Sequence, residues 1–270
     1  MPPGSQTWLR ERLRCRLYPV MAALTLTAIE GIPMIMAGDN LAELIAHAMD
    51  LQGLRVRNGD ILSICQKIVS KAEGRLVNLK EVEPSPMARK FAERWDKDPR
   101  AVELVLRQTS RIVRMDNAVL IVETGPGWVC ANAGIDESNS LEDDRAILLP
   151  EDPDASAARL RHDLKRLTGA EIAVLITDTF GRPWRDGLTE VCLGIAGMDP
   201  MLDLRGTTDL GGRELHHTVI AIADELAAAA GLLMPKAGAT PAVLIRGYHY
   251  KAADGSAKAL IRPAASDLFR

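Results

Sequence analysis

The apolar positions of the chain gather in short runs, and the longest of these predict buried strands. Residues 172–177 form a continuous apolar run, which is typical of a strand that is covered on both faces. Residues 61–66 follow an Asn-Gly-Asp turn and predict another strand. There are four further apolar segments, and they are 119–123, 128–131, 191–196 and 242–246. A hairpin-like turn at 125–127 joins the first two of them.

Apolar residues at helical spacing, together with capping residues, predict the helices. Asp39 can cap a helix over 41–49, where four apolar residues fall on one face. Asp152 and Pro153 are typical of a helix start, and Gly169 ends the helix that they open. Two further segments are predicted to be helical, and they are 84–95 and the Ala-rich 218–233.

The predicted strands and helices do not alternate strictly, so the fold class is expected to be mixed α/β, of the α+β type, with mixed sheets. Residues 24–35 are expected to be extended and to lead into this fold. Residues 1–20 carry four arginines and are interpreted as an N-terminal extension. Residues 21–270 are then expected to form the functional domain, in two structural lobes.

Composition and charge mainly exclude classes of function. The chain has 270 residues, 47% of them hydrophobic, and is long enough to bury a substantial core. A net charge of −3 gives no reason to expect a nucleic-acid partner, which calls for a basic face. No apolar run approaches the roughly 20 residues needed to cross a bilayer. The sequence therefore predicts neither nucleic-acid binding nor a membrane partner.

The four cysteines are far apart in the sequence and include no CxxC pair, which disfavours a zinc site built from them. Three lie in apolar runs, so we expect small buried thiols in a reducing, cytoplasmic setting. The four are Cys15, Cys65, Cys130 and Cys192.

Three polar stretches that follow strands are the candidates for chemistry. In the first, Lys67, Lys71 and Arg75 recur at four-residue spacing, which suits either a polyphosphate site or a solvated basic edge. In the second, residues 131–139 supply carboxylates and amides around a glycine, which suits a hard cation or an Asx-rich turn equally.

The third stretch, residues 177–185, favours function over a plain surface loop. Asp178 ends the buried strand, a common place for a metal-binding carboxylate, and Arg182 and Arg185 add cations for a phosphate or carboxylate. By contrast, the adjacent His216 and His217 would point to opposite faces of a strand, so they are interpreted as ordinary polar neighbours.

The familiar nucleotide and hydrolase motifs are absent. The sequence contains no GxxxxGK[ST] P-loop, no GxGxxG opening a βαβ unit and no GxSxG elbow. A nucleotide site in this chain would therefore be of a non-P-loop kind.

Taken together, several blocks in fixed order resemble the coenzyme F-420-0:γ-glutamyl ligase family. The resemblance covers about residues 24–270, and the order of several long blocks is what makes it specific. The blocks are 31–35 (GIPMI), 38–39 (GD), 66–75 (QKIVSKAEGR), 130–139 (CANAGIDESN), 177–185 (TDTFGRPWR), 204–206 (LRG), 212–214 (GRE), 223–227 (ADELA) and 243–247 (VLIRG).

The resemblance implies an intertwined homodimer of two-part α/β subunits, with the nucleotide near the interface. GTP would phosphorylate a carboxylate of F-420-0 or a related acid, and the amine of L-glutamate would attack the acyl phosphate. The implied cofactors are one or two Mg²⁺ or Mn²⁺ ions, with K⁺ as a further candidate.

The resemblance also implies roles for individual residues. Metal ligation falls to Asp136, Asp178 and Thr179, and the catalytic charges fall to Lys71, Arg182 and Arg185. The residues expected to bind the nucleotide are Ile32, Pro33, Met34 and Ile35 around the guanine, with Gln66, Lys67, Lys71 and Asn139.

Two departures from the family pattern bear on the substrate. Residues 234–240 replace an acidic, Gly-containing stretch, and Lys236 within them cannot ligate metal while protonated. We expect Lys236 to offer its charge to a phosphate of the nucleotide. Glu190 stands where the family tends to have a small apolar residue.

These departures keep two alternatives open. One is an amide ligase of the same fold with a different carboxylate, amine or nucleotide. The other is a non-catalytic, nucleotide-binding regulatory protein, against which the presence of Asp136, Asp178, Lys71 and Arg182 argues.

Overall fold

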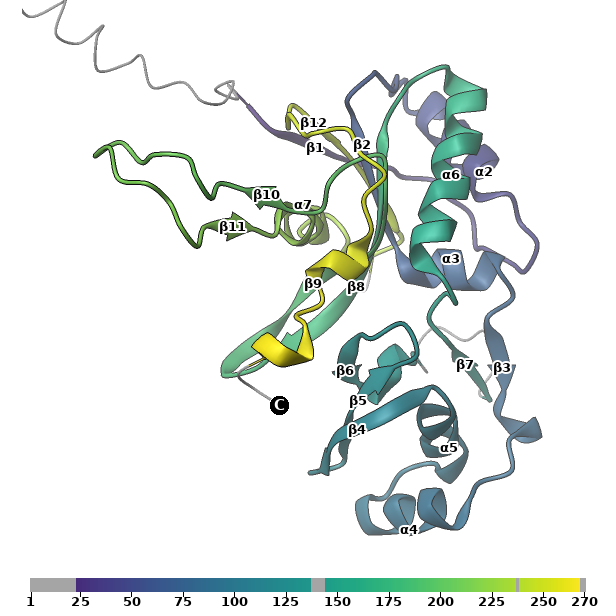
Figure 1. Cartoon of the computed structure of the whole chain (residues 1–270). Coiled ribbons are helices and arrows are strands. Elements are labelled where there is room, and N and C mark those ends of the chain that lie inside the picture. The colour runs from purple at the N-terminus through teal and green to yellow at the C-terminus, as the bar shows by residue number, and fades with distance from the viewer. Residues whose placement is uncertain (1–22, 137–143, 237, 268–270) are drawn as a thin grey trace, which may run out of the picture.

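A computed structural model describes residues 23–136, 144–236 and 238–267. A five-stranded sheet lies at its centre (Figure 1). The β2–β8 pair is parallel and the other neighbours are antiparallel, so the sheet is mixed and the predicted α/β class is confirmed. In spatial order the strands are β1 (Thr25–Ala28), β12 (Ala242–Arg246), β2 (Ile61–Cys65), β8 (Ala173–Arg182) and β9 (Arg185–Ala196).

Helices cover both faces of this sheet (Figure 1). On one face lie α2 (Leu41–Leu51), α3 (Gln66–Ala72) and α6 (Pro153–Thr168), and on the other lies α7 (Ile222–Gly231). Along β8, Val174 and Ile176 pack in the cluster that contains α2 and α6, whereas Ala173 and Leu175 pack in the cluster of α7. The apolar run is therefore buried on both faces, as the sequence predicts.

Residues 76–147 form a second group of elements, which Figure 1 shows beyond the α3 end of the sheet. It has an apolar cluster of its own, centred on Phe91, Val102, Leu120 and Val122. Its elements are β3 (Leu76–Asn78), η1 (Leu79–Glu81), α4 (Pro86–Trp95), α5 (Pro99–Arg107), β4 (Thr109–Asp116), β5 (Val119–Thr124), β6 (Val129–Ala131), η2 (Asn132–Gly134) and β7 (Arg145–Ile147).

Two hairpins project from the central sheet (Figure 1). The outer halves of β8 and β9 continue beyond the sheet, and every residue of 181–188 is exposed. The strands β10 (Leu202–Asp203) and β11 (Val219–Ile220) open a longer arm. Large apolar side chains stand on both, since Trp184 is 79% exposed and Leu210 is 91% exposed. The chain then ends in two short turns, η3 (Ala257–Leu260) and η4 (Ala264–Ser266).

Several element boundaries confirm the capping argument. The Asp152 carboxylate accepts a hydrogen bond from the Ala155 amide, and Gly169, with φ of 72°, ends α6. At α2, however, the cap is Asn40, whose side chain accepts from the Ala42 and Glu43 amides. The prediction of Asp39 was wrong by one residue, because its carboxylate instead accepts from the Met36 amide and closes the preceding turn.

Other boundaries shift because tertiary pairing competes with local preference. The predicted strand 61–66 ends at Cys65, and Gln66 begins α3. The prediction that Asp178 ends the strand 172–177 was wrong, because pairing with β9 continues β8 to Arg182. The predicted helix 218–233 begins only at Ile222, because Val219–Ile220 pairs with β10. The hairpin about 125–127 is confirmed by the pairing of β5 with β6. Within the described ranges, no helix is both long and apolar enough to span a bilayer.

Candidate functional site

A cavity of about 620 Å³ lies where β2 and the parallel part of β8 end. Its walls come from four separate parts of the chain, which are the segment 32–35, helix α3 with the residue before it, the inner part of the β8–β9 hairpin, and the described part of the loop 234–241. Ten residues singled out from the sequence line it, and they are Ile32, Pro33, Met34, Ile35, Gln66, Lys67, Lys71, Asp178, Thr179 and Lys236.

The parallel pairing of β2 with β8 explains why distant segments meet here. Cys65 lies opposite Thr177 in the register, so the next residues, Gln66 and Asp178, leave the parallel pair at the same edge of the sheet. Ligands bind preferentially at such strand ends in α/β sheets. The two central strands therefore fix the lysines of α3 on one side and the acidic part of β8 on the other.

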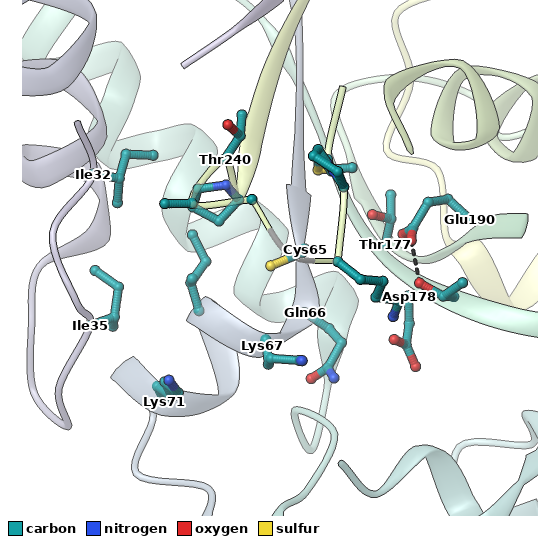
Figure 2. A pocket seen from close by; sticks show the side chains of 18 of the residues that line it. Ile32, Ile35, Cys65, Gln66, Lys67, Lys71, Thr177, Asp178, Glu190 and Thr240 are labelled. Atoms are coloured by element: carbon teal, nitrogen blue, oxygen red, sulfur yellow. Dashed lines mark hydrogen bonds between the residues drawn. The ribbon is translucent and has the colours of Figure 1, made fainter. Parts of the chain in front are cut away.

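The cavity has an apolar side and a charged side (Figure 2). Ile32 and Ile35 lie along one wall, and Asp178 and Glu190 lie across from them. Lys67 and Lys71, one helical turn apart on α3, lie between these two sides. Such a division suits a ligand with an apolar ring at one end and a charged, cation-associated group at the other.

Lys71 is the more enclosed of the two lysines, with 8% of its surface exposed. Burial lowers its pKa, and the charge of Lys67 lowers it further. Its ammonium group lies 3.6 Å from the Met34 sulfur. The Lys67 ammonium group lies 2.6 Å from Asp136 Oδ2. A buried ammonium group beside a second cation is well placed to attract an anionic ligand.

The acidic side of the cavity is formed by neighbouring residues of β8 and β9. Burial raises the pKa of Asp178 to about 7, the backbone N–H of Thr179 lowers it, and the charge of Glu190 raises it again. The Thr179 hydroxyl donates a hydrogen bond to Glu190 Oε1, drawn as the dashed line in Figure 2. The other oxygen, Glu190 Oε2, is buried and has no hydrogen-bond partner among the residues that the structure describes.

These oxygen donors fit a hard divalent cation. Asp178 and Glu190 offer carboxylates and Thr179 offers a hydroxyl, the ligand types that Mg²⁺ and Mn²⁺ prefer. Glu190 Oε2 is buried without a hydrogen-bond partner among the described residues, and a bound cation would satisfy this oxygen. Among the described residues, no three side chains of His, Cys, Asp or Glu gather closely enough to hold a metal. A cation here would therefore need the hydroxyl, water or a bound ligand as well.

Other predicted site residues lie elsewhere. Asp136 lies beside the cavity rather than in its lining, held by two backbone hydrogen bonds with Ile147. Asn139 falls outside the described residues, so its predicted contact with GTP stays a prediction. Arg182 and Arg185 stand on the exposed end of the β8–β9 hairpin and do not line the cavity.

Arg75 does not join Lys67 and Lys71 in the structure, although its spacing in the sequence suggests that it would. Helix α3 ends at Ala72, so the four-residue periodicity does not extend to Arg75. Its guanidinium instead donates to the Leu149 carbonyl and pairs with Glu151 at 2.7 Å. His216 and His217 are exposed and lie before β11 rather than on a strand, so the expected opposite faces of a strand do not apply to them.

The cysteines largely follow expectation. Cys130 and Cys192 are buried free thiols, and burial raises the pKa of Cys130 to about 12. Cys65 is free and partly buried, and it lines the cavity. Cys15 lies outside the described residues.

Glu190 is the site residue that reasoning from the sequence missed. Counting back from the hairpin turn pairs Thr179 with Leu188, whereas the observed register places Thr179 opposite Glu190. The difference arises from a register shift between Gly181 and Arg182, of the kind that a β-bulge produces. The only available signal was the acidic residue at a position where the resemblance leads one to expect a small one.

Comparison with known proteins gives a consistent result over most of the chain. The family model described as F420-0:Gamma-glutamyl ligase matches residues 31–247, which include every described residue that lines the cavity. This range also contains the blocks from 31 to 247 on which the resemblance was recognised.

Several relatives match this chain over nearly their whole length. A protein of Methanothermobacter thermautotrophicus named coenzyme F420:L-glutamate ligase is 48% identical over 251 residues, covering 92% of this chain and 99% of that protein. A protein of the same name from Methanopyrus kandleri is 46% identical and covers 93% and 100%, respectively. A third, from Archaeoglobus fulgidus, is 42% identical and covers 90% and 94%.

Proposed function

Because the chain belongs to the F420-0:gamma-glutamyl ligase family, we propose that it joins L-glutamate in amide linkage to coenzyme F-420-0, with GTP as the energy source. The observation that carries this proposal is the similarity over nearly the full length of relatives named for that ligation. The cavity supports it, because the matched region brings the candidate residues of four segments together.

The proposed reaction first makes the carboxylate electrophilic. An oxygen of the F-420-0 carboxylate attacks the γ-phosphorus of GTP, the bond to the β-phosphate oxygen breaks, and GDP leaves. The amine of L-glutamate then attacks the acyl carbon, the bond to the phosphate oxygen breaks, and inorganic phosphate leaves. The amine loses a proton in forming the amide. Such transfers depend on positioning and charge neutralisation more than on a covalent protein group.

The two sides of the cavity divide this work. Ile32, Pro33, Met34 and Ile35 give the guanine an apolar wall, while Gln66, Lys67 and Lys71 meet the phosphates. Lys71 is effective because its charge is held in a largely dry position, where electrostatic interactions weaken less. Lys236, on the opposite loop, adds a third positive charge near the phosphates.

Asp178 and Thr179, with Asp136 near them, would hold Mg²⁺ or Mn²⁺, and K⁺ is a further candidate cation. When bound, a divalent ion neutralises charge that develops on the transferred phosphoryl group. Asp136 contacts Lys67 at 2.6 Å, so its approach to a cation requires Lys67 to turn towards the phosphates. The same rearrangement would deliver a positive charge to the nucleotide.

The proposed active assembly is an intertwined homodimer. Trp184 and Leu210 stand exposed on hairpins that project from the sheet, and apolar side chains in such positions favour association. Arg182 and Arg185 share the first of these hairpins and do not line the cavity of their own chain. Their proposed catalytic role would therefore be exercised near the interface of the two copies.

A second candidate function is an amide ligase of the same fold that takes another carboxylate, amine or nucleotide. It is favoured by one specific observation, since Lys236 and Glu190 both line the cavity. Phosphate release measured over a panel of acids and amines would separate the two. A rate with another acid well above that with F-420-0 would favour this candidate.

The direct test combines purified protein with GTP, Mn²⁺, L-glutamate and F-420-0. Mass spectrometry should find the glutamyl product, with one GDP formed for each amide bond. Binding of all components without turnover would contradict the proposal and favour a non-catalytic nucleotide-binding protein. An Asp178→Asn variant that kept its full role in the cell would point the same way.

A further inference from the structure

Glu190 occupies a built position in the cavity wall. It lies on β9 directly opposite Thr179 on β8, and the Thr179 hydroxyl donates to its Oε1. Its Oε2 is buried and accepts no hydrogen bond from any residue that the structure describes, and the side chain lines the same cavity as Asp178. Among the described residues, the carboxylate is thus held at one oxygen only.

The end of helix α7 fixes the stem of Glu190. Gly231, the last residue of α7, packs so closely that a Cβ there would lie 2.5 Å from Glu190 Cγ and 3.2 Å from its Cβ. Only glycine permits this approach, since real Cβ atoms do not come so near another atom. With α7 on one side and Thr179 on another, Glu190 has little room to turn away.

Glu190 lies among other charged groups of the cavity wall. Burial is the main cause of the raised pKa of Asp178; the charge of Glu190 raises this pKa further, and the charge of Lys236 lowers it. In the part of the chain that the structure describes, Glu190 forms no salt bridge, whereas Lys67 is engaged with Asp136. A buried carboxylate oxygen without a partner is costly, so such an arrangement favours an added cation.

We propose that Glu190 is a ligand of the divalent cation, binding it through Oε2 beside the Asp178 carboxylate and the Thr179 hydroxyl. This inference rests on the proposed function, which calls for the cation. It adds a third oxygen donor to the two that the resemblance assigns at this wall. Glu190 also holds the Thr179 hydroxyl, which donates its hydrogen to Oε1 and so keeps its oxygen lone pairs available as acceptors.

Mn²⁺ binding tests the proposal without any turnover. Isothermal titration of the full chain with Mn²⁺, alone and with GTP, would compare the unaltered protein with Glu190→Gln. We expect the variant to bind Mn²⁺ at least about tenfold more weakly, since loss of even an outer partner of a metal ligand costs about 10- to 100-fold. Glu225→Gln is the matched control, because Glu225 is an exposed carboxylate on α7, and its Mn²⁺ affinity should not change.

A second readout separates direct ligation from a general effect of charge. Water proton relaxation reports how many water molecules bound Mn²⁺ retains, and this number should rise by about one in Glu190→Gln. An unchanged number with weaker binding would overturn ligation and leave only long-range attraction. Equal Mn²⁺ affinity with weaker L-glutamate binding would also overturn it, and would assign Glu190 to the substrate ammonium instead.

The two proposals fail in different ways. A protein that binds Mn²⁺ through Glu190 but forms no amide removes the proposed function and leaves this inference standing. An unaltered protein that binds no Mn²⁺, with or without GTP, overturns the inference. Thermal unfolding of the metal-free proteins checks the fold of Glu190→Gln, which should be at least as stable as the unaltered chain, because a buried charge is removed.

Discussion

Asp178, Thr179 and Glu190 lie at the base of the β8–β9 hairpin, whereas Arg182, Trp184 and Arg185 lie at its tip. The base faces the cavity, and burial there raises the pKa of Asp178 to about 7. The tip is exposed throughout, and Arg182 donates to the Asp186 carbonyl within the turn itself. One sequence block, 177–185, therefore spans two environments, and its residues are expected to contribute in different ways.

The largest expected effect is at the base. Asp178→Asn keeps the shape of the side chain but removes the charge that the proposed cation needs. We expect ligase turnover to fall about 100- to 1,000-fold, the size typical of losing one preorganised charged group. Steady-state rates of GDP formation measure this, with far-ultraviolet circular dichroism as the control for folding. A loss of less than tenfold would mean that the base does not carry the chemistry.

The pH dependence of stability provides the next test of the base. The pKa of Asp178 is raised from 3.8 to about 7, so between these values the native state holds a proton that the unfolded chain has released. Stability of the metal-free protein should therefore fall as pH rises from about 4 to about 7. We expect a loss of about 2–3 kcal/mol, less than the full shift implies because water reaches the cavity.

Denaturant unfolding of chelator-treated protein at pH 4.5 and pH 8 measures this loss. Asp178→Asn should lack that part of the pH dependence, and added Mn²⁺ should restore stability at pH 8. If the unaltered protein and the variant showed the same dependence, the buried carboxyl would not be its source.

A substitution of Lys71 tests whether the nucleotide binds to the side of the cavity that lies across from the base of the β8–β9 hairpin. Lys71→Met removes a largely buried charge while keeping most of the side-chain volume. We expect GTP to bind about tenfold or more weakly, since hydrogen bonds to charged groups contribute about 1.5–3 kcal/mol. Binding of a fluorescent GTP analogue measures this. Lys90→Met, on the exposed face of α4, is the matched control and should bind like the unaltered protein.

The hairpin tip should affect association more than nucleotide binding. Trp184→Ala removes a side chain that is 79% exposed, and we expect about tenfold weaker self-association if the tip is an interface anchor. Sedimentation at a series of concentrations measures the dimer dissociation constant. A monomeric unaltered protein, or a variant that dimerises equally well, would remove the tip from the interface.

The smallest expected effect is that of Arg182 on GTP binding, and it directly compares the tip of the hairpin with its base. Arg182→Gln should leave GTP affinity within about twofold of the unaltered protein, because the guanidinium does not line the cavity. A lower turnover with unchanged GTP affinity would support a role near the dimer interface. A large loss of GTP affinity would show instead that the tip folds over the nucleotide.

Much of the central sheet could be predicted from the sequence. The run 172–177 has no polar side because both of its faces are buried, and Asp152 with Gly169 bounds α6 through local capping. These features depend on neighbours in the chain. The boundary between β11 and α7 could not be predicted, since it depends on β10 pairing with a segment that is otherwise a good helix former.

The candidate site was predicted as a set of residues but not as an arrangement. Asp178 follows the last residue of β8 that pairs with β2, and Lys71 lies on the helix that follows β2, so both belong to segments that the sequence indicates. Glu190 was not assigned, because its place opposite Thr179 depends on a register shift in the hairpin. Arg182 was grouped with Asp178 by proximity in sequence, yet a few extended residues carry it to the exposed tip. The roles of these residues stay predictions that the experiments above address.

The position of β8 between β2 and β9 has a consequence for how the cavity can move. Residues 174–177 of β8 are paired with β2 on one edge and with β9 on the other, so their amide hydrogens should exchange with solvent only when most of the molecule unfolds. The strand segment that leads into Asp178 is then as rigid as the protein core. Any slowing of hydrogen exchange upon nucleotide binding should instead appear in segment 32–35 and in the described part of 234–241, where the opposing walls are loops.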